Sequence, residues 1–301
     1  MQPTYDPCRL CPRACGAHRL SGKAGLCGAS SDIRVARASL HLWEEPPISG
    51  TNGSGTVFFS GCPLGCVYCQ NRDIALGKRG HSVTLPQLVR TYRALAAAGA
   101  HNLNLVTATQ YLPDVIRSVS EAKRQGVLLP VVWNTSGYET VESVKALSGT
   151  VDIWLTDFRY FSPGTAAAYS HAPDYPEAAR AALRQMYAQT GAPVFGDSVL
   201  MKKGVIVRLL LLPGHLIEAK RILHELWEQY GDGICLSLMS QYTPMPGMQP
   251  PLDRRVGEAE YRSFVAEAER LGITRAFTQE REAAADSFIP PFDDPGLLCL
   301  D

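Results

Sequence analysis

Residues 56–71 read TVFFSGCPLGCVYCQN, an apolar run followed at once by three cysteines. The run at 56–61 is rich in β-branched and aromatic residues, which predicts a buried strand. Cys62, Cys66 and Cys69 lie in the loop that follows it. In proteins with parallel strands and intervening helices, functional groups gather on loops that leave the carboxyl ends of the strands. The stretch therefore predicts an α/β fold with a functional loop after this strand.

The spacing of Cys62, Cys66 and Cys69 suits an iron–sulfur cluster with one open corner. Such clusters are normally held by four Cys thiolates, so a loop that supplies three leaves one of the four irons of a cube without a protein ligand. Catalytic zinc sites keep an open position for the same purpose. Gly61 and Gly65 let the backbone wrap closely around a cube. A zinc loop that lacks its fourth ligand, or three unrelated core cysteines, are the other interpretations.

Beyond residue 71, apolar runs alternate with helical patterns, which is typical of successive βα units. The run VIVRLLLLPG has no polar alternation, as is usual for buried parallel strands. About six units in order are too few for a closed eightfold barrel, and the pattern alone also allows an open doubly wound sheet. The further strands are expected at 102–108, 129–137, 151–158, 205–214, 234–241 and 274–277, and the helices at 85–98, 113–125, 138–149, 178–189, 217–230 and 258–271.

The overall composition excludes several classes of partner. Lysine plus arginine and aspartate plus glutamate both total 29, so no net positive field attracts nucleic acid or an anionic membrane surface. The N-terminus lacks the apolar core of a signal peptide, and no apolar run approaches the roughly 18 residues of a membrane span. We therefore expect a cytoplasmic protein with no nucleic-acid partner and no membrane partner.

A second group of cysteines lies near the N-terminus: Cys8, Cys11, Cys15 and Cys27. We expect residues 1–50, rich in Cys, Gly and Arg, to form a small metal-binding cap, followed at 51–301 by the α/β domain with a C-terminal extension. Four thiolates close a tetrahedral site with no free corner, so zinc and a second iron–sulfur cluster are both allowed. Basic residues around the site would stabilise its thiolates: Arg9, Arg13, His18, Arg19 and Lys23.

Three stretches together resemble the radical S-adenosylmethionine (SAM) enzymes: CRLCPRACGAHRLSGKAGLCG at 8–28, HLWEEPPISG at 41–50 and GSGTVFFSGCPLGCVYCQN at 53–71. More narrowly, they resemble the uncharacterised relatives of pyruvate formate-lyase activating enzyme. The resemblance implies a partial (βα)6 TIM-like barrel, a 4Fe–4S cluster on the loop cysteines and SAM at its open iron. It also implies reductive cleavage of SAM to methionine and a 5′-deoxyadenosyl radical, with reduced flavodoxin or ferredoxin as electron donor.

The resemblance also implies residues at strand ends that would hold SAM. Tyr68 stands where the family has an aromatic residue beside the adenine, and a packing ring is the alternative. After the second strand, Thr107-Ala108-Thr109-Gln110 replaces the family's Gly-Gly-Glu-like run, so the hydroxyls of Thr107 and Thr109 would meet the amino group of SAM without a charged partner. Asn134, after the third strand, suits contacts with the ribose or carboxylate, and turn formation is the alternative.

Charged residues end the fourth and fifth strands. Asp157 and Arg159 resemble the Asp-x-Lys of glycyl-radical activating enzymes, with Arg in place of Lys, and residues at alternate strand positions share one face. A structural ion pair is the alternative. Arg208 would suit the carboxylate of SAM through a bidentate pair. His215 follows a Pro-Gly turn and would either contact SAM or cap a helix.

Three functions fit these observations. The first is an activase that takes a hydrogen atom from a glycine of a partner glycyl-radical enzyme, as the resemblance implies. The second keeps the radical chemistry but acts on a small molecule or a ribosomal peptide; the four-cysteine cap, which is not expected in the simplest activating enzymes, favours it. The third is a zinc-holding interaction module without enzymatic activity.

Overall fold

The computed structural model describes residues 3–196, 199–278 and 292–301, and one curved sheet organises them. The strands pair in the order β10-β9-β8-β6-β5-β4-β2-β1-β3, with β7 paired to β8. From β2 to β10 every pair on this path is parallel. The parallel strands are β2 (Ser54–Phe59), β4 (Leu103–Val106), β5 (Val131–Thr135), β6 (Ile153–Asp157), β8 (Met201–Leu210), β9 (Cys235–Met239) and β10 (Ala276–Thr278).

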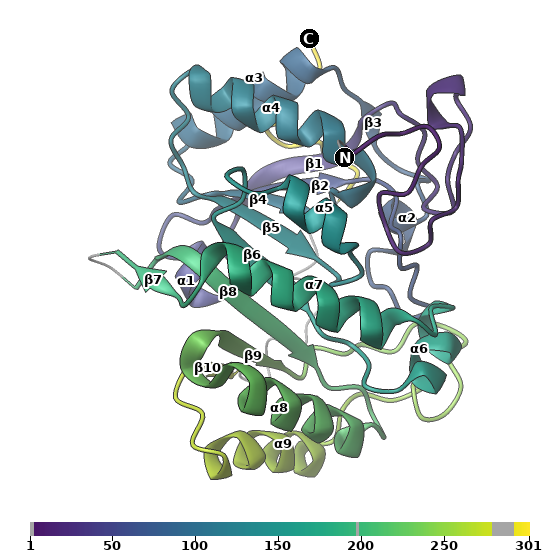
Figure 1. The fold of residues 1–301 in the computed structure, drawn as a ribbon, viewed down its shortest axis with the longest axis vertical. Coiled ribbons are helices and arrows are strands. Elements are labelled where there is room, and N and C mark those ends of the chain that lie inside the picture. The colour runs from purple at the N-terminus through teal and green to yellow at the C-terminus, as the bar shows by residue number, and fades with distance from the viewer. Residues whose placement is uncertain (1–2, 197–198, 279–291) are drawn as a thin grey trace.

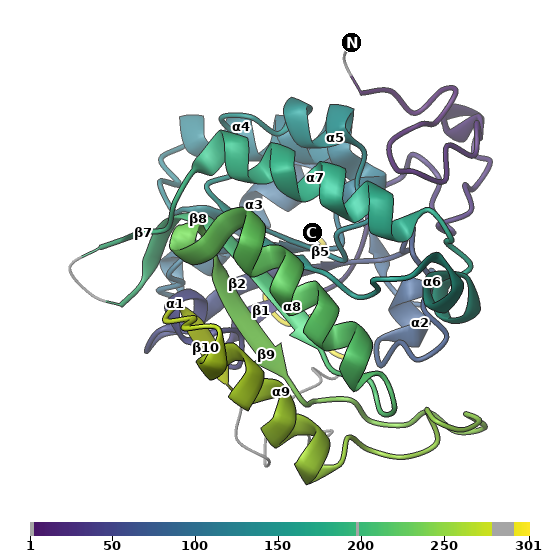
Figure 2. The ribbon, with the colours of Figure 1, turned by 60° about the horizontal axis from the view of Figure 1, so that its bottom comes forward.

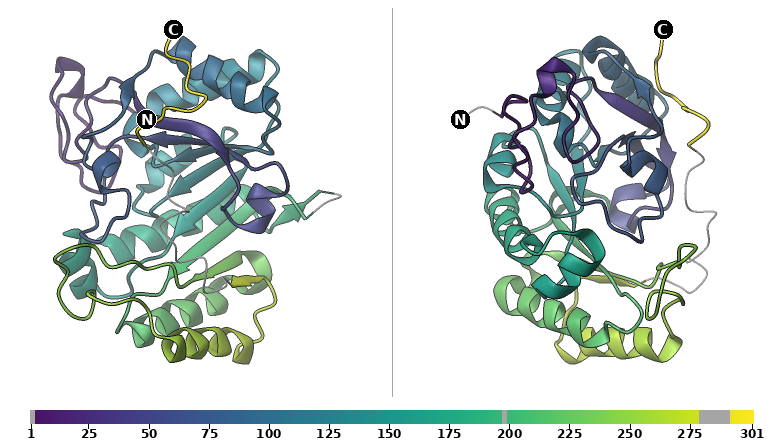
Figure 3. Two further views of the ribbon diagram at one scale, coloured as in Figure 1. Left: turned by 180° about the vertical axis from the view of Figure 1, so that it is seen from behind. Right: turned by 90° about the vertical axis from the view of Figure 1, so that its right-hand side faces the viewer.

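Long helices cover the outer face of the sheet (Figures 1 and 2). The view from behind in Figure 3 shows no long helix on the inner face. A doubly wound sheet needs helices on both faces, so the structure agrees with the partial barrel. The outer helices are α3 (Leu85–Ala97), α4 (Leu112–Arg124), α5 (Val141–Ala146), α6 (Pro163–Ser170), α7 (Tyr175–Thr190), α8 (Leu216–Tyr230) and α9 (Glu258–Arg270).

The expected α/β class and the order of the βα units are confirmed, and the short strand expected at 274–277 is β10, which pairs parallel with β9. The largest difference in bounds is at β8, which runs from Met201 to Leu210 instead of over 205–214. Strand β4 ends at Val106 instead of residue 108. The chain turns there because Thr107 has a φ of 54° and a 3-10 turn, η2 (Thr109–Tyr111), follows. Short elements complete the chain: η1 (Arg19–Ser21), α1 (Pro46–Ser49), α2 (Arg72–Ala75), β3 (His81–Ser82), β7 (Val194–Phe195) and η3 (Gly231–Gly233).

Strand β1 (Arg34–His41) lies within the segment expected to be a separate cap. It pairs antiparallel with β2, from Val35 opposite Phe59 to His41 opposite Ser54, and so extends the sheet of the barrel. Its small and apolar residues Val35, Ala36 and Ala38 are buried. Sequence patterning missed this strand because arginines and a serine interrupt the apolar positions. Residues 3–33 carry the four cysteines, and their role as a metal-held cap stays a prediction.

Helix α1 closes one end of the space inside the curved sheet. Because β1 runs antiparallel to β2, it ends beside the first residue of β2, and α1 therefore lies at the amino ends of the parallel strands. Ile48 of α1 is fully buried in an apolar cluster with Val132, Ile153 and Ile206. This cluster forms a packed floor, and the functional groups gather above it.

We expect Ile48→Ala to lower the free energy of unfolding by about 2–5 kcal/mol, because a large buried side chain would leave a cavity in the floor. Ile217→Ala is the matched control, since Ile217 is 73% exposed on α8. Urea denaturation followed by circular dichroism measures both. Equal midpoints for the two variants would contradict the proposed role of α1.

Within the part of the chain that the structure describes, no helix combines the length and apolar character needed to cross a bilayer.

Candidate active site

The three loop cysteines lie together at the carboxyl end of β2. Cys62, Cys66 and Cys69 all line one cavity of about 870 Å³. Gly61, directly before them, has a φ of 88°, and a Cβ there would lie 2.8 Å from the carbonyl oxygen of Cys27. The amide of Cys62 donates to that same carbonyl oxygen at 3.1 Å. The loop therefore needs glycine at position 61, and it is pinned to the N-terminal segment.

The surroundings of the cysteines fit an iron–sulfur cluster held at three corners. Burial raises the pKa of the Cys62 thiol, and it raises that of Cys69 to about 12. Two donors face Cys66: the Ser170 hydroxyl lies 3.1 Å from its sulfur, and a guanidinium nitrogen of Arg159 lies 3.5 Å from it. Donors and a cation beside the sulfur stabilise the thiolate form that binds iron.

A chain of charged groups crosses the cavity next to the cysteines. Asp157 accepts hydrogen bonds from Arg159 at 2.5 and 3.0 Å and from Nε of Arg208 at 2.8 Å. Arg208 also donates to Oδ1 of Asn134 at 2.6 Å and lies 3.5 Å from Oε2 of Glu44. Four of the residues singled out by sequence therefore touch one another across β5, β6 and β8. Their roles in binding SAM stay predictions.

The charge state of this chain follows from its contacts. Burial alone would raise the pKa of Asp157, but Arg208 and Arg159 outweigh it and hold the pKa below its usual value. Burial raises the pKa of Glu44 even though Arg208 and Asn104 oppose it. Asp157 is thus a fixed anion between two guanidinium groups, whereas Glu44 is the more easily protonated carboxyl.

Tyr68 and Thr107 line the same cavity, and their contacts with SAM stay predictions. The Tyr68 hydroxyl bonds that of Tyr160 at 2.8 Å, and its ring packs edge-on against Tyr242, so it is a packing ring as well as a cavity residue. Thr109 does not face the cavity: its hydroxyl donates to Oε1 of Glu139 at 2.6 Å. The turn after β4 therefore offers the cavity one of its two threonines.

Gln110, in the same turn, has a role that sequence analysis missed. It is buried, and its side-chain amide donates to the carbonyl oxygens of Ser60 and Gly61 at 3.0 Å and to that of Thr107 at 2.6 Å. It therefore fixes the start of the cysteine loop to the end of β4. The long polar side chain of Gln110, after three small residues at 107–109, was the sequence feature that could have indicated this role.

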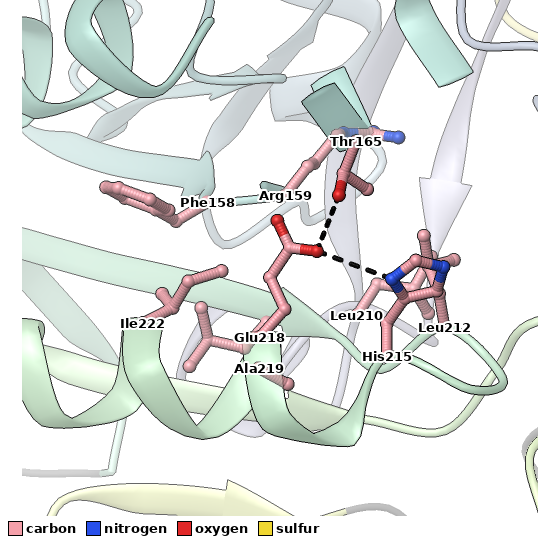
Figure 4. A pocket seen from close by; sticks show the side chains of 10 residues that line it. Phe158, Arg159, Thr165, Leu210, Leu212, His215, Glu218, Ala219 and Ile222 are labelled. Carbon is pink, nitrogen blue, oxygen red and sulfur yellow. Dashed lines mark hydrogen bonds and ion pairs between the residues drawn. The ribbon is translucent and has the colours of Figure 1, made fainter. Parts of the chain in front are cut away.

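His215 lies outside the large cavity, at the residue before α8. Figure 4 shows it in a separate small pocket with Glu218 and Thr165. Its Nδ1 lies 3.3 Å from Oε2 of Glu218, and its Nε2 lies 2.9 Å from the Tyr169 hydroxyl. His215 is thus the residue at the start of α8, but its side chain makes no capping hydrogen bond to the helix backbone, and its contact with SAM stays a prediction.

The four N-terminal cysteines line one small pocket beside the loop, together with Pro63 and Gln110: they are Cys8, Cys11, Cys15 and Cys27. A Cβ on Gly25 would lie 3.3 and 3.4 Å from the sulfurs of Cys15 and Cys27, so glycine leaves room for both. Arg19, fully buried, lies 3.7 Å from the Cys8 sulfur. Four thiols are a suitable donor set for a closed metal site. Among the described residues, however, no three ligating side chains lie close enough together to hold one metal ion.

Arg13 lines the pocket of the four thiols and also connects this segment to the cysteine loop. It donates to the carbonyl oxygens of Pro63 and Leu64 at 3.0 and 3.1 Å and to that of Ser170 at 2.6 Å. A guanidinium that bonds several carbonyl oxygens at once holds their loops in a fixed relative position. The N-terminal segment is therefore part of the support of the three-cysteine loop.

Glu139 is a buried carboxyl outside the cavity, with Oε1 bonded by Thr109, Thr135 and Trp133. Burial raises its pKa despite these bonds. The folded state therefore holds a proton that the unfolded state releases near pH ~4.3. Between that pH and the raised folded pKa, the stability that Glu139 contributes falls as pH rises.

We expect Glu139→Gln to flatten the dependence of unfolding free energy on pH above the unfolded pKa of about 4.3. Glu142→Gln, an exposed change on α5 in the same region, serves as the control. Urea midpoints across this range give the slope. A wild-type slope that survives in Glu139→Gln would show that another group causes it.

Residues 56–185 match the Radical SAM superfamily. The "Uncharacterized protein MJ0674" of Methanocaldococcus jannaschii is 26% identical over 282 residues, covering 89% of this chain and 76% of that protein.

Two solved structures have similar folds. One is a crystal structure of HydG, a maturase of the FeFe-hydrogenase, with a TM-score of 0.48 and 17% identity over 72% of this chain and 48% of that chain. The other is Streptococcus suis SuiB, with a TM-score of 0.49 and 10% identity over 78% of this chain and 50% of that chain. The chain thus spans about half the length of each. Residues 56–185, which match the Radical SAM superfamily, include the three-cysteine loop and strands β4, β5 and β6.

Proposed function

We propose that this radical SAM enzyme removes a hydrogen atom from a substrate held in the cavity beside its three-cysteine loop. The match of residues 56–185 to the radical SAM superfamily implies a 4Fe–4S cluster and SAM. When bound, they supply an electron to the sulfonium and a 5′-deoxyadenosyl radical that takes the hydrogen atom. The observation that supports the proposal is that all three cysteines line the same 870 Å³ cavity as the Asp157 ion-pair chain.

The residues of the chain would position the reactants. Cys62, Cys66 and Cys69 would hold the cluster, while Arg159 and Arg208, both held by Asp157, would face the carboxylate of SAM. The cavity lies in the upper part of the ~300–1,000 Å³ range of ligand sites, so it suits more than one small ligand. The apolar floor with Ile48 separates it from solvent at the amino end of the strands.

The first candidate target is a glycine of a partner glycyl-radical enzyme, as the similarity of the cysteine loop to activating enzymes supports. Reduced flavodoxin or ferredoxin would supply the electron. In this function a partner's glycine loop enters the cavity, and the chain provides backbone contacts to it.

A specific observation favours a second target, a small molecule or a peptide with a polar side chain. The cavity is lined by the carboxyl groups of Glu44 and Glu45 in addition to Asp157. A glycine offers these carboxyls no side chain to bind. The four-cysteine group beside the loop, not needed for SAM cleavage alone, agrees with this function.

Anaerobic reconstitution with iron and sulfide tests the shared part of the proposal. About four irons per chain would mean one cluster and about eight would mean two. Reduced protein and SAM should then yield 5′-deoxyadenosine. A glycyl doublet in electron paramagnetic resonance with a cognate glycyl-radical enzyme would identify the first target, and a modified product in mass spectrometry the second. Iron-free protein that yields no 5′-deoxyadenosine would contradict both and leave the zinc-holding module.

A further inference from the structure

We propose that Glu44 and Glu45 form a subsite that binds a cationic nitrogen group of the substrate, a primary amine or a guanidinium. The inference rests on the proposed function, because it names the substrate class of the same cavity. Both side chains line the cavity that the three cysteines also line. They enter it from the segment after β1, whereas the cysteines enter it from the loop after β2.

The backbone explains why two glutamates lie inside the barrel. β1 ends at His41, beside the start of β2, and α1 begins at Pro46 and buries Ile48 in the floor. The four residues between these two elements must therefore cross the amino end of the sheet. Glu44 and Glu45 lie in this crossing, and the side chain of Glu44 is only 9% exposed.

Both carboxyl oxygens of Glu44 have partners among the neighbouring side chains. Its Oε1 accepts hydrogen bonds from the amides of Asn104 at 3.1 Å and Asn134 at 3.2 Å. Its Oε2 lies 3.5 Å from Arg208. Glu44 thus joins the ion-pair chain of the SAM-binding strand ends to the segment that carries Glu45.

Glu45 has one carboxyl oxygen without a hydrogen-bond partner. Its side chain is buried, with 7% of the residue exposed, and its Oε2 has no hydrogen-bond partner among the residues that the structure describes. The Ser237 hydroxyl bonds to its carboxyl group, and the charge of Arg208, which Glu44 and Asp157 share, also acts on it. A buried carboxylate oxygen without a donor is costly unless a ligand supplies one.

The charge balance of the cavity favours a cation as that ligand. Three carboxyl groups line it, those of Glu44, Glu45 and Asp157, against the two guanidinium groups of Arg159 and Arg208. His41, also in the lining, does not restore the balance, because burial lowers its pKa even though Glu45 opposes this. Burial raises the pKa of both Glu44 and Glu45, and a ligand ammonium or guanidinium would favour their charged form and make the stronger, charge-assisted hydrogen bonds.

The walls near this subsite suit the stem of such a group. Phe58 and Phe277 line the cavity, and a cationic side chain normally lays its methylene stem along apolar surface. The substrate is therefore a molecule with an alkyl chain ending in a cationic nitrogen. A free alkylamine and the side chain of a lysine or arginine in a peptide share this chemistry.

The test uses the reconstituted protein with SAM and a matched pair of probes, n-pentylamine and 1-pentanol. Isothermal titration calorimetry under anaerobic conditions measures the affinity for each probe. The peptides Gly-Gly-Lys-Gly-Gly and Gly-Gly-norleucine-Gly-Gly form a second pair. We expect each cationic probe that binds to do so at least about tenfold more tightly than its neutral partner. Binding of the lysine peptide alone would assign a polypeptide substrate, and binding of the amine a small molecule.

Glu45→Gln should weaken cation binding by about tenfold or more and leave the neutral probe unaffected. Glu228→Gln, the same change at an exposed position of α8, should bind the cation as the wild type does. Equal affinity for the charged and neutral probes, no binding of either cation by the wild type, or an unchanged affinity in Glu45→Gln would each overturn the proposal.

Substrate-free formation of 5′-deoxyadenosine separates this proposal from the proposed function. Glu228→Gln, the exposed control on α8, should retain this slow reaction and its full iron content. Wild-type protein that binds the cation but yields no 5′-deoxyadenosine would contradict the proposed function and leave the subsite intact. Protein that cleaves SAM but does not bind the cations would overturn the subsite and leave the proposed function intact.

Discussion

Cys66→Ala should abolish formation of 5′-deoxyadenosine, with a loss greater than the roughly 10–100-fold that removal of an outer-shell partner of a metal site costs. Cys66 is buried, and it is the loop cysteine that receives donors from both Ser170 and Arg159. Without its thiolate, the loop supplies two ligands instead of three, which is too few to hold a cube. The assay is liquid chromatography of the reduced reaction with SAM, together with iron and sulfide counts.

Cys235→Ala is the matched control for this experiment. Cys235 is also buried, but it lies in the apolar floor of the barrel and does not line the cavity. It should keep full iron content and activity. Cys11→Ala tests the second group: a loss of about four irons there would mean an iron–sulfur cluster, and no loss would mean zinc or no iron. If Cys66→Ala retained wild-type activity, the three-cysteine loop would not be the active centre.

Asp157→Asn should produce the second large effect, a loss of about 3–5 kcal/mol in unfolding free energy at neutral pH. The change removes the carboxylate between Arg159 and Arg208 and leaves buried guanidinium groups without their shared counter-ion. SAM cleavage should also fall, on the order of 10–100-fold, because both arginines would lose their orientation. Urea denaturation and the 5′-deoxyadenosine assay measure the two effects.

Two variants separate stability from activity. Asp253→Asn, at an exposed position, controls for the substitution itself and should change neither quantity. The double variant Asp157→Asn, Arg159→Gln removes one of the uncompensated cations, so it should recover part of the stability but not the activity. Full activity in Asp157→Asn would show that the ion-pair chain is structural alone.

Asp157 should make the unfolding free energy of the wild type fall at acidic pH. Because its folded pKa is depressed, it stabilises the fold above the unfolded value of about 3.9, and this contribution is lost as pH falls through the folded pKa. Glu139, whose folded pKa is raised, acts in the opposite direction. The two groups therefore narrow the pH range of maximal stability, Asp157 from the acidic side and Glu139 from the alkaline side.

Patterns local in sequence predicted most of the sheet. The apolar runs of β5, β6 and β8 are long and uninterrupted, and each has few alternatives to a buried strand. β1 escaped prediction because Arg34, Arg37 and Ser39 break its apolar pattern, and its identity as a strand depends on pairing with β2. Pairing partners distant in sequence cannot be read from one segment.

The same distinction applies to the site residues. Asp157 and Arg208 were predicted because a charge at the end of an apolar strand can face only the barrel mouth. His215 has the same local setting but lies in another pocket, bonded to Glu218 and Tyr169. Sequence analysis did not predict Glu44 and Glu45 as site residues. They lie far from the loop in sequence and enter the cavity only through the turn between β1 and α1.

The sequence by itself determined the βα order and the three-cysteine loop, because strand periodicity and ligand spacing are encoded within a few residues. Only the tertiary structure decided that β1 joins the sheet, that the four-cysteine segment bonds to the loop through Cys27 and Arg13, and that two glutamates share the cavity. These features depend on contacts between segments tens to more than a hundred residues apart. Such contacts form when the chain closes around its core, and no local pattern specifies them.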